Sequence, residues 1–197
     1  MTVAALIRKF ADRYHLPVEV EDVVQELRER GIKDEIYFFW DHQISTGSLS
    51  GFIQHWDYII DGEPRRCADI TYAKSNNELE RLVSTKEMLH ILDPAYALVA
   101  NDAEIEGLME KIILPPDMVD LATDGIHALT DRVAVAQALA VLFPLAARQA
   151  LLQPYKDKKI SLEAIADRAE LPPRYVAAVM SDTWEQTLAI LEAMGEN

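Results

Sequence analysis

Cysteine, glycine and long apolar runs are scarce in this sequence, and each scarcity excludes a class of protein. Cys67 is the only cysteine among 197 residues, so no intramolecular disulfide can form and a reducing cytoplasm is expected. With seven glycines, no glycine-rich phosphate-binding loop follows a strand. No apolar run approaches the roughly 20 residues of a membrane span. The first residues lack a cleavable signal pattern, so we expect a cytoplasmic protein.

Basic side chains are also in deficit. The chain has 19 Lys and Arg residues against 33 Asp and Glu residues, a formal net charge of −14. Surfaces that bind nucleic acid or anionic lipid need clustered cations. We therefore expect a protein partner and no membrane, and the charge argues against nucleic acid. Nothing in the pattern specifies an oligomeric state.

Half of the residues are apolar, which is enough for a well-packed domain. The predicted fold class is α+β, mostly helical with a small antiparallel sheet, and Asp61-Gly62 supplies a hairpin turn. We divide the chain into a domain over 1–130 and a helical C-terminal subdomain over 131–197. The periodicity predicts helices over 3–14, 21–30, 79–93, 102–114, 131–152 (interrupted near Pro144) and 182–194, and strands over 36–40, 51–60 and 67–72.

The helix predicted over 79–93 carries the most informative motif. Lys86, Glu87 and His90 have the spacing of the zinc-peptidase signature H-E-x-x-H, with lysine at the first histidine position. In that signature two imidazoles bind one Zn²⁺, and the glutamate is general base to the metal-bound water. Deprotonating a lysine with a reference pKa near 10.4 costs roughly 4–5 kcal/mol at pH 7. The motif is therefore in frame but lacks one metal ligand.

The order of parts along nearly the whole chain resembles the ImmA/IrrE family of zinc metallopeptidases. The matching parts are Leu-Pro-Val-x-Val-Glu at 16–21, the strand 68–72 before an Asn-containing turn, Arg-Leu-Val-x-x-Lys-Glu-x-x-His at 81–90, Ile-Ile-Leu-Pro at 112–115 and Ser-Leu-Glu-Ala-Ile-Ala at 161–166. The resemblance implies a zincin-like fold, with the sheet packed on the active-site helix. It also implies a setting in which repressor-type regulators of phages, mobile elements or stress responses are cut.

The resemblance implies a role for each matching position. Glu87 would be the general base, His90 a zinc ligand and Glu104, from the following helix, a further ligand. Additional candidates are Glu106 and Asp93. The edge strand that holds a substrate or partner would comprise Asp69, Ile70, Thr71 and Tyr72. Lys86 stands where the remaining histidine ligand is missing.

Lys86 itself suggests what replaces the metal. An ammonium facing Glu104 and Glu87 would supply the positive charge that buried carboxylates need, which predicts no cofactor, with zinc only if the site is retained. Two alternatives remain open. Glu87 and His90 can be ordinary helix residues outside any site, and His42 or His55 could approach from the strands to complete a metal shell.

The C-terminal segment 161–180 has helix–turn–helix spacing. Its second helix offers only Arg174 and Tyr175 as polar side chains, and the segment carries three acids and two arginines. A helix that reads DNA presents several Arg, Lys, Asn or Gln side chains. We therefore expect a packing module or a docking surface here.

These observations favour a catalytically impaired, metallopeptidase-like protein that acts as a regulatory interaction module. Lys86 predicts that it is inactive as an enzyme. One alternative is an active zinc-dependent endopeptidase of ImmA/IrrE type that cleaves a repressor-like protein. The other is a DNA-associated regulator that acts through the C-terminal segment.

Overall fold

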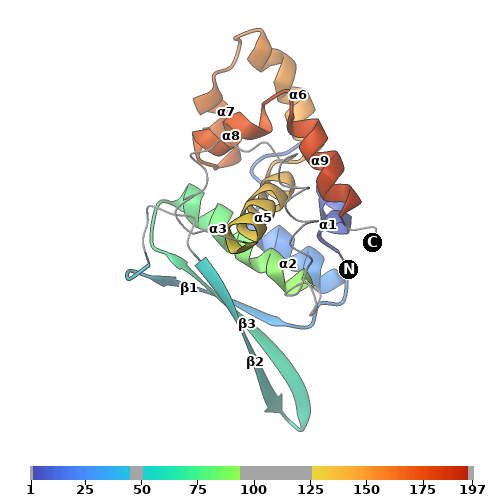
Figure 1. Cartoon of the computed structure of the whole chain (residues 1–197), viewed down its shortest axis with the longest axis vertical. Helices are drawn as coiled ribbons and strands as arrows, with labels where there is room; N and C mark the ends of the chain where they lie inside the picture. Colours follow the sequence, from blue (N-terminus) through green and yellow to red (C-terminus); the bar gives the residue numbers. More distant parts are fainter. Residues whose placement is uncertain (1, 45–50, 94–125, 195–197) are drawn as a thin grey trace.

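Figure 1 shows a computed structural model of the chain, which describes residues 2–44, 51–93 and 126–194. The fold is α+β, as predicted, and the described helices lie on one side of a small sheet. In chain order the elements are α1 (Val3–Phe10), α2 (Val20–Glu29), β1 (Glu35–Asp41), β2 (Gly51–Ile60), β3 (Glu63–Ala73), α3 (Asn77–Leu89), the 3-10 turn η1 (His90–Leu92), α5 (Ile126–Leu142), α6 (Leu145–Lys156), α7 (Leu162–Ala169), α8 (Pro173–Val179) and α9 (Trp184–Ala193). The helix expected over 102–114 lies outside the described residues.

The sheet is mixed, which corrects the antiparallel sheet expected from the sequence. Its strand order is β1-β3-β2, with β2 antiparallel and β1 parallel to β3. The tight turn at Asp61 and Gly62, both with positive φ, pairs β2 with β3 locally. β1 then joins the remaining edge of β3, where it runs in the same direction as that strand. A short apolar run in the sequence predicts a strand, but it does not predict which strand lies beside it or whether the two are parallel.

The residues expected to form an edge strand lie in the middle of the sheet instead. Asp69, Ile70, Thr71 and Tyr72 belong to β3. Their backbone is paired with β1 on one side and with β2 on the other, so they have no free edge for strand addition. The edges of the three-stranded sheet are β1 and β2.

Helix α3 lies between the sheet and the other helices, in contact with β2, β3, α2 and α5. Asn76 caps its first turn by accepting a hydrogen bond from the Leu79 amide at 3.0 Å. Every residue from Arg81 to Leu89 is buried, because α3 has neighbours on all sides.

The core is continuous across the expected domain boundary. α5 contacts α3, α1, α8 and α9, and one cluster of buried side chains extends from Val3 to Leu191. The boundary placed at residues 130 and 131 falls inside α5, and the division into two domains stays a prediction. The break expected near Pro144 is confirmed, since α5 ends at Leu142 and α6 begins at Leu145.

In the described part of the chain, no single helix is long and apolar enough to cross a membrane. The segments Arg132–Leu142 and Leu145–Lys156, bent by 82° at their break, meet the length and composition test only as a pair.

Arg81 ties α3 to two distant parts of the chain. Its buried guanidinium donates to Glu19 Oε2 and to the Val18 carbonyl, each at 2.7 Å. Its Nη1 also lies 3.6 Å from Glu170 Oε2, at the end of α7. These contacts hold the joint before α2 and the end of α7 against the first turns of α3.

We expect Arg81→Met to lower the free energy of unfolding by about 2–4 kcal/mol, because it removes a buried cation and leaves the Val18 carbonyl without its donor. Urea denaturation measures the change. Arg168→Met is the matched control, since Arg168 lies exposed on α7, and its effect should stay within about 0.5 kcal/mol. Equal effects of the two substitutions would contradict the role assigned to Arg81.

Candidate functional site

Lys86 and Glu87 form an ion pair inside the protein. Lys86 Nζ lies 2.9 Å from Glu87 Oε1, and the two side chains are 3% and 5% exposed. Neighbouring helix residues point in directions about 100° apart, so the flexible lysine stem must bend toward the carboxylate. Glu87 Oε1 accepts no hydrogen bond of good geometry from the described residues. The ammonium charge is therefore the interaction that this oxygen has in the described part of the chain.

The pair is buried because α3 is covered from the sheet side. Gly51, at the start of β2, lies directly against the helix: a Cβ added there would sit 2.7 Å from Val83 Cγ1 and 3.0 Å from Glu87 Cγ. Glycine allows this close approach of strand and helix. Glu87 thus adjoins the edge strand β2, while α5 covers other parts of α3.

His90 and Asp93 form a second pair, just beyond α3. His90 begins the 3-10 turn η1, and its Nδ1 lies 2.6 Å from Asp93 Oδ2. Burial disfavours the charged imidazole, but the bond to Asp93 and the negative charges of Asp93 and Glu87 outweigh burial and the opposing charge of Lys86. The pKa of His90 is therefore raised above its ordinary value of 6.5. Asp93 lies within hydrogen-bond distance of the imidazole, and its role as a possible extra ligand stays a prediction.

Of the expected zinc site, the described residues include Lys86, Glu87 and His90. A zinc site needs at least three Cys, His or carboxylate ligands converging on one point. No group of three such residues that could hold a metal occurs among the described residues, and Lys86 brings an ammonium to the first ligand position. Glu104 and Glu106, the candidates for the third ligand, lie outside the described residues.

The other two histidines considered for a metal shell lie in the β region. His42 follows β1, and its ring packs edge-on against Trp40 at 4.7 Å between centroids. His55 lies within β2, opposite Ala68 of β3, and the structure assigns it to no ligand group with His90. Burial lowers the pKa of His55, which keeps its imidazole neutral near pH 7.

Cys67 is an inert thiol in β3. Burial and a hydrogen bond from Sγ to Asp69 Oδ1, at 3.0 Å, raise its pKa to about 11. The negative charges of Asp69, Glu35 and Asp34 act in the same direction as burial. The thiol is buried.

A hollow of about 820 Å³ lies away from α3, at the beginning of β1. Its lining mixes four cations with three carboxylates, and one of these pairs, Arg66 with Asp34, is joined at 2.7 Å. The hollow shares no residue with the Lys86–Glu87 pair, so we base the candidate site on the buried charges. Its lining comprises Arg28, Ile32, Lys33, Asp34, Glu35, Ile36, Tyr37, Glu63, Pro64, Arg65 and Arg66.

Sequence reasoning missed Gly51, and it considered Asp93 only as a metal ligand. Gly51 reads as an ordinary strand residue, and no local pattern signals that it faces Glu87. Asp93 stands three residues after His90, a spacing that brings side chains together on one helical face. That spacing could have suggested a hydrogen bond to the imidazole as readily as a metal ligand.

We expect Asp93→Asn to destabilise the fold more in acid than in alkali. A raised His90 pKa stabilises the folded state below the unfolded value of 6.5, and this contribution disappears as pH rises through the folded value. The substitution should lower the free energy of unfolding at pH 5.5 by at most about 1 kcal/mol, and by less at pH 9. Urea denaturation at both pH values tests this. The control Asp12→Asn, at an exposed position, should show no pH-dependent difference, and a loss that grows toward pH 9 would refute the assignment.

Comparison of the chain with protein-family models, with curated proteins and with solved structures finds no match in any of the three.

Proposed function

We propose that this chain is a non-catalytic, metallopeptidase-like interaction protein with a regulatory role. The Lys86 ammonium takes the place of a zinc-ligating histidine and supplies positive charge to Glu87. The observation that carries the proposal is the buried ion pair of 2.9 Å between these two side chains. A cation has replaced a ligand while the carboxylate and His90 are kept.

The geometry of Glu87 supports the absence of catalysis. A general base must reach the proton of an attacking water or hydroxyl within about 2.6–3.2 Å. Glu87 is only 5% exposed, and one of its oxygens already lies at an ammonium. In this position the carboxylate neutralises a buried charge, and it has little access to a substrate.

Two further features support descent from a zincin-like site. The helix that carries the motif packs on the sheet beside the edge strand β2. His90 is held at Nδ1 by a carboxylate, the arrangement that orients histidine ligands in zinc sites and leaves Nε2 for the metal. We infer that the contact of Asp93 with His90 was retained when the first zinc ligand was lost.

The partner segment would bind along β2. Strand addition to an exposed sheet edge gives main-chain hydrogen bonds to a bound segment, and β2 is the edge that adjoins Glu87. A repressor-type regulator held in this way would be retained uncut. The chain would then act by binding its partner.

The C-terminal pair α7 and α8 fits a packing role better than DNA reading. Tyr175, Val176, Ala178 and Val179 of α8 are all buried. The remaining polar side chain, Arg174, lies over the Tyr175 ring at 4.8 Å. We therefore assign this helix–turn–helix-like end to the protein core.

We expect negligible zinc in the purified protein at equimolar load, and up to one zinc per chain after Lys86→His. The substitution restores two imidazoles at i and i+4. Elemental analysis after gel filtration gives the stoichiometry. Lys74→His is the matched control, since Lys74 lies on the segment between β3 and α3, and it should add no zinc. His90→Ala combined with Lys86→His should abolish the gain.

Each result of this experiment decides one part of the proposal. One tightly held zinc in the unaltered chain, or peptide-bond cleavage that stops with a chelator, would overturn the non-catalytic assignment. Failure of Lys86→His to take up zinc would overturn the inferred zincin-like origin.

Site-specific photo-crosslinking in cells tests whether a partner segment adds to the edge of β2. A photoreactive phenylalanine analogue at His55, exposed in β2, should give discrete protein adducts that mass spectrometry identifies. The same analogue at Tyr14, which is 67% exposed beyond α1, is the control and should give few. Equal yields from both positions would contradict β2 as the docking edge.

A further inference from the structure

The face of the sheet turned away from the helices forms a trough along β3. Gly51 faces α3, and successive side chains along a strand point to opposite faces of the sheet. Every second residue of β2 from Gly51, with the residues paired to it on the other strands, therefore lies on the helix side. The residues between them lie on the open side. On the open side the central strand carries the small side chains Cys67, Asp69 and Thr71. The flanking strands carry large rings opposite them: Tyr37 and Phe39 from β1, and Phe52 and Trp56 from β2. We call these seven residues the sheet trough.

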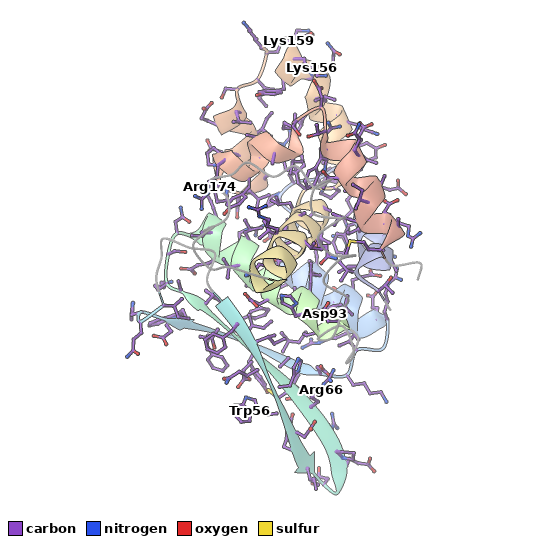
Figure 2. All side chains as sticks on the ribbon, in the orientation of Figure 1. Trp56, Arg66, Asp93, Lys156, Lys159 and Arg174 are labelled. Carbon is purple, nitrogen blue, oxygen red and sulfur yellow. The ribbon has the colours of Figure 1, made fainter. Side chains whose placement is uncertain are left out.

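The walls of the trough are exposed to an unusual degree. Tyr37, Phe39, Phe52 and Trp56 are 47%, 48%, 43% and 53% exposed. At about 150–250 Å² per ring system, these half-exposed side chains present roughly 300–500 Å² of largely apolar surface, near the upper limit for a patch on a monomer. No described helix covers this face, and Figure 2 shows Trp56 and Arg66 on opposite sides of the β2–β3 ladder.

The dimensions of the trough suit a planar cation. Its walls stand on strands two spacings apart, about 10 Å. A flat group held between two rings needs about 7–8 Å between the ring planes, twice the optimal contact distance. Thr71 lies between Phe39 and Phe52 in register, and Asp69 lies between Tyr37 and Gln54 in the next row. A guanidinium could therefore stack between Phe39 and Phe52 above Thr71, one row from the carboxylate of Asp69.

The charges of the open face favour a cation. Asp69 stands on the floor of the trough, where its Oδ1 accepts a weak hydrogen bond from Cys67 Sγ. Glu35, one row away, is held as a carboxylate because hydrogen bonds from Tyr37 and Tyr58 and the charge of Arg65 lower its pKa. The Tyr37 hydroxyl donates to Glu35 Oε2 at 2.8 Å, which fixes the ring that forms the wall.

We propose that the sheet trough binds an arginine-rich segment of a protein partner, with a guanidinium stacked between the aromatic walls over β3 and paired with Asp69. Arginine is favoured over lysine because its planar head stacks on rings and meets a carboxylate with two donors. The trough does not depend on the fate of Lys86, since it lies on the other side of the sheet from α3.

Two other occupants fit the charges less well. A nucleic acid could stack bases on the rings, but its phosphates would meet Asp69 and Glu35 on a chain of net charge −14. A second copy of this chain would bring the same carboxylates face to face, and like charges across an interface oppose association. A basic peptide has the complementary sign.

The experiment measures binding of a fluorescein-labelled peptide in which arginine alternates with serine, by anisotropy at physiological salt. Citrulline keeps the shape of arginine without its charge, and the citrulline peptide should bind roughly tenfold more weakly or not at all. Trp56→Ser and Phe52→Ser should each weaken binding of the arginine peptide roughly 5- to 30-fold. Asp69→Asn should weaken it about tenfold.

Matched controls lie on the same hairpin but on the other face. Asp57, opposite Arg66, and Ile59, opposite Pro64 and 75% exposed, share β2 with Trp56. Asp57→Asn changes the net charge as Asp69→Asn does, and Ile59→Ser removes as much exposed apolar surface. Each control should alter affinity less than twofold. Near-ultraviolet circular dichroism shows whether each variant folds. If Asp69→Asn does not fold, Phe52→Ser still tests the proposal.

Several outcomes would overturn the proposal. Equal losses from Asp57→Asn and Asp69→Asn would show that general acidity attracts the peptide. Tight binding of a single-stranded oligonucleotide, abolished by Trp56→Ser, would assign the trough to nucleic acid. Self-association abolished by Phe52→Ser would assign it to a second copy. If the arginine peptide does not bind, the proposal that the sheet trough binds an arginine-rich segment is wrong.

Discussion

Burial of α3 depends on the opposed charges of Lys86 and Glu87, which lie 2.9 Å apart in the layer between the sheet and the helices. Removing two charges from water costs several kcal/mol for each, and their attraction offsets this cost only when they meet closely. Because the two residues are neighbours on one helix, α3 carries both charges of the pair itself. This part of the helix can therefore be buried, with Gly51 of β2 directly against it.

Buried cations recur elsewhere in this acidic chain. Arg148 of α6 is 1% exposed, and it donates to the carbonyls of Val179 and Ser181 at 2.7 and 2.8 Å. Like Arg81, it joins a helix to backbone oxygens of a distant segment. Glu26, Asp34 and Glu87 are buried too, so buried cations and buried carboxylates are equal in number among the described residues. The net charge of −14 attracts basic partners over long distances.

Local features of the fold could be read from the sequence, and long-range ones could not. The Asn76 cap, the Asp61-Gly62 turn and the break at Pro144 follow from the chemistry of a few adjacent residues. The position of β1 beside β3 depends on two segments that are distant in sequence. For this reason the residues Asp69 to Tyr72 were assigned to an edge that the fold gives to β2.

The candidate site shows the same division. The spacing of Lys86, Glu87 and His90 identified the helix that matters, because the motif lies within one element. Burial of that helix on all sides could not be deduced, since its polar residues suggest a solvent-exposed face. The exposure of the rings of Tyr37 to Trp40 could not be deduced either, because an apolar run is typical of a strand buried on both faces.

The β2–β3 hairpin extends beyond the helices, so its far half lacks the core that anchors its near half (Figure 1). Glu63, Pro64, Arg65 and Arg66 are exposed, whereas Ala68 and Ile70, further along the same strand, are fully buried. Protection of the amides against hydrogen exchange should therefore increase from the tip toward α3. The tip at Asp61 and Gly62 is also a natural site for inserting an affinity tag or a fluorescent domain, because a long insertion at an exposed turn leaves the packed layers undisturbed.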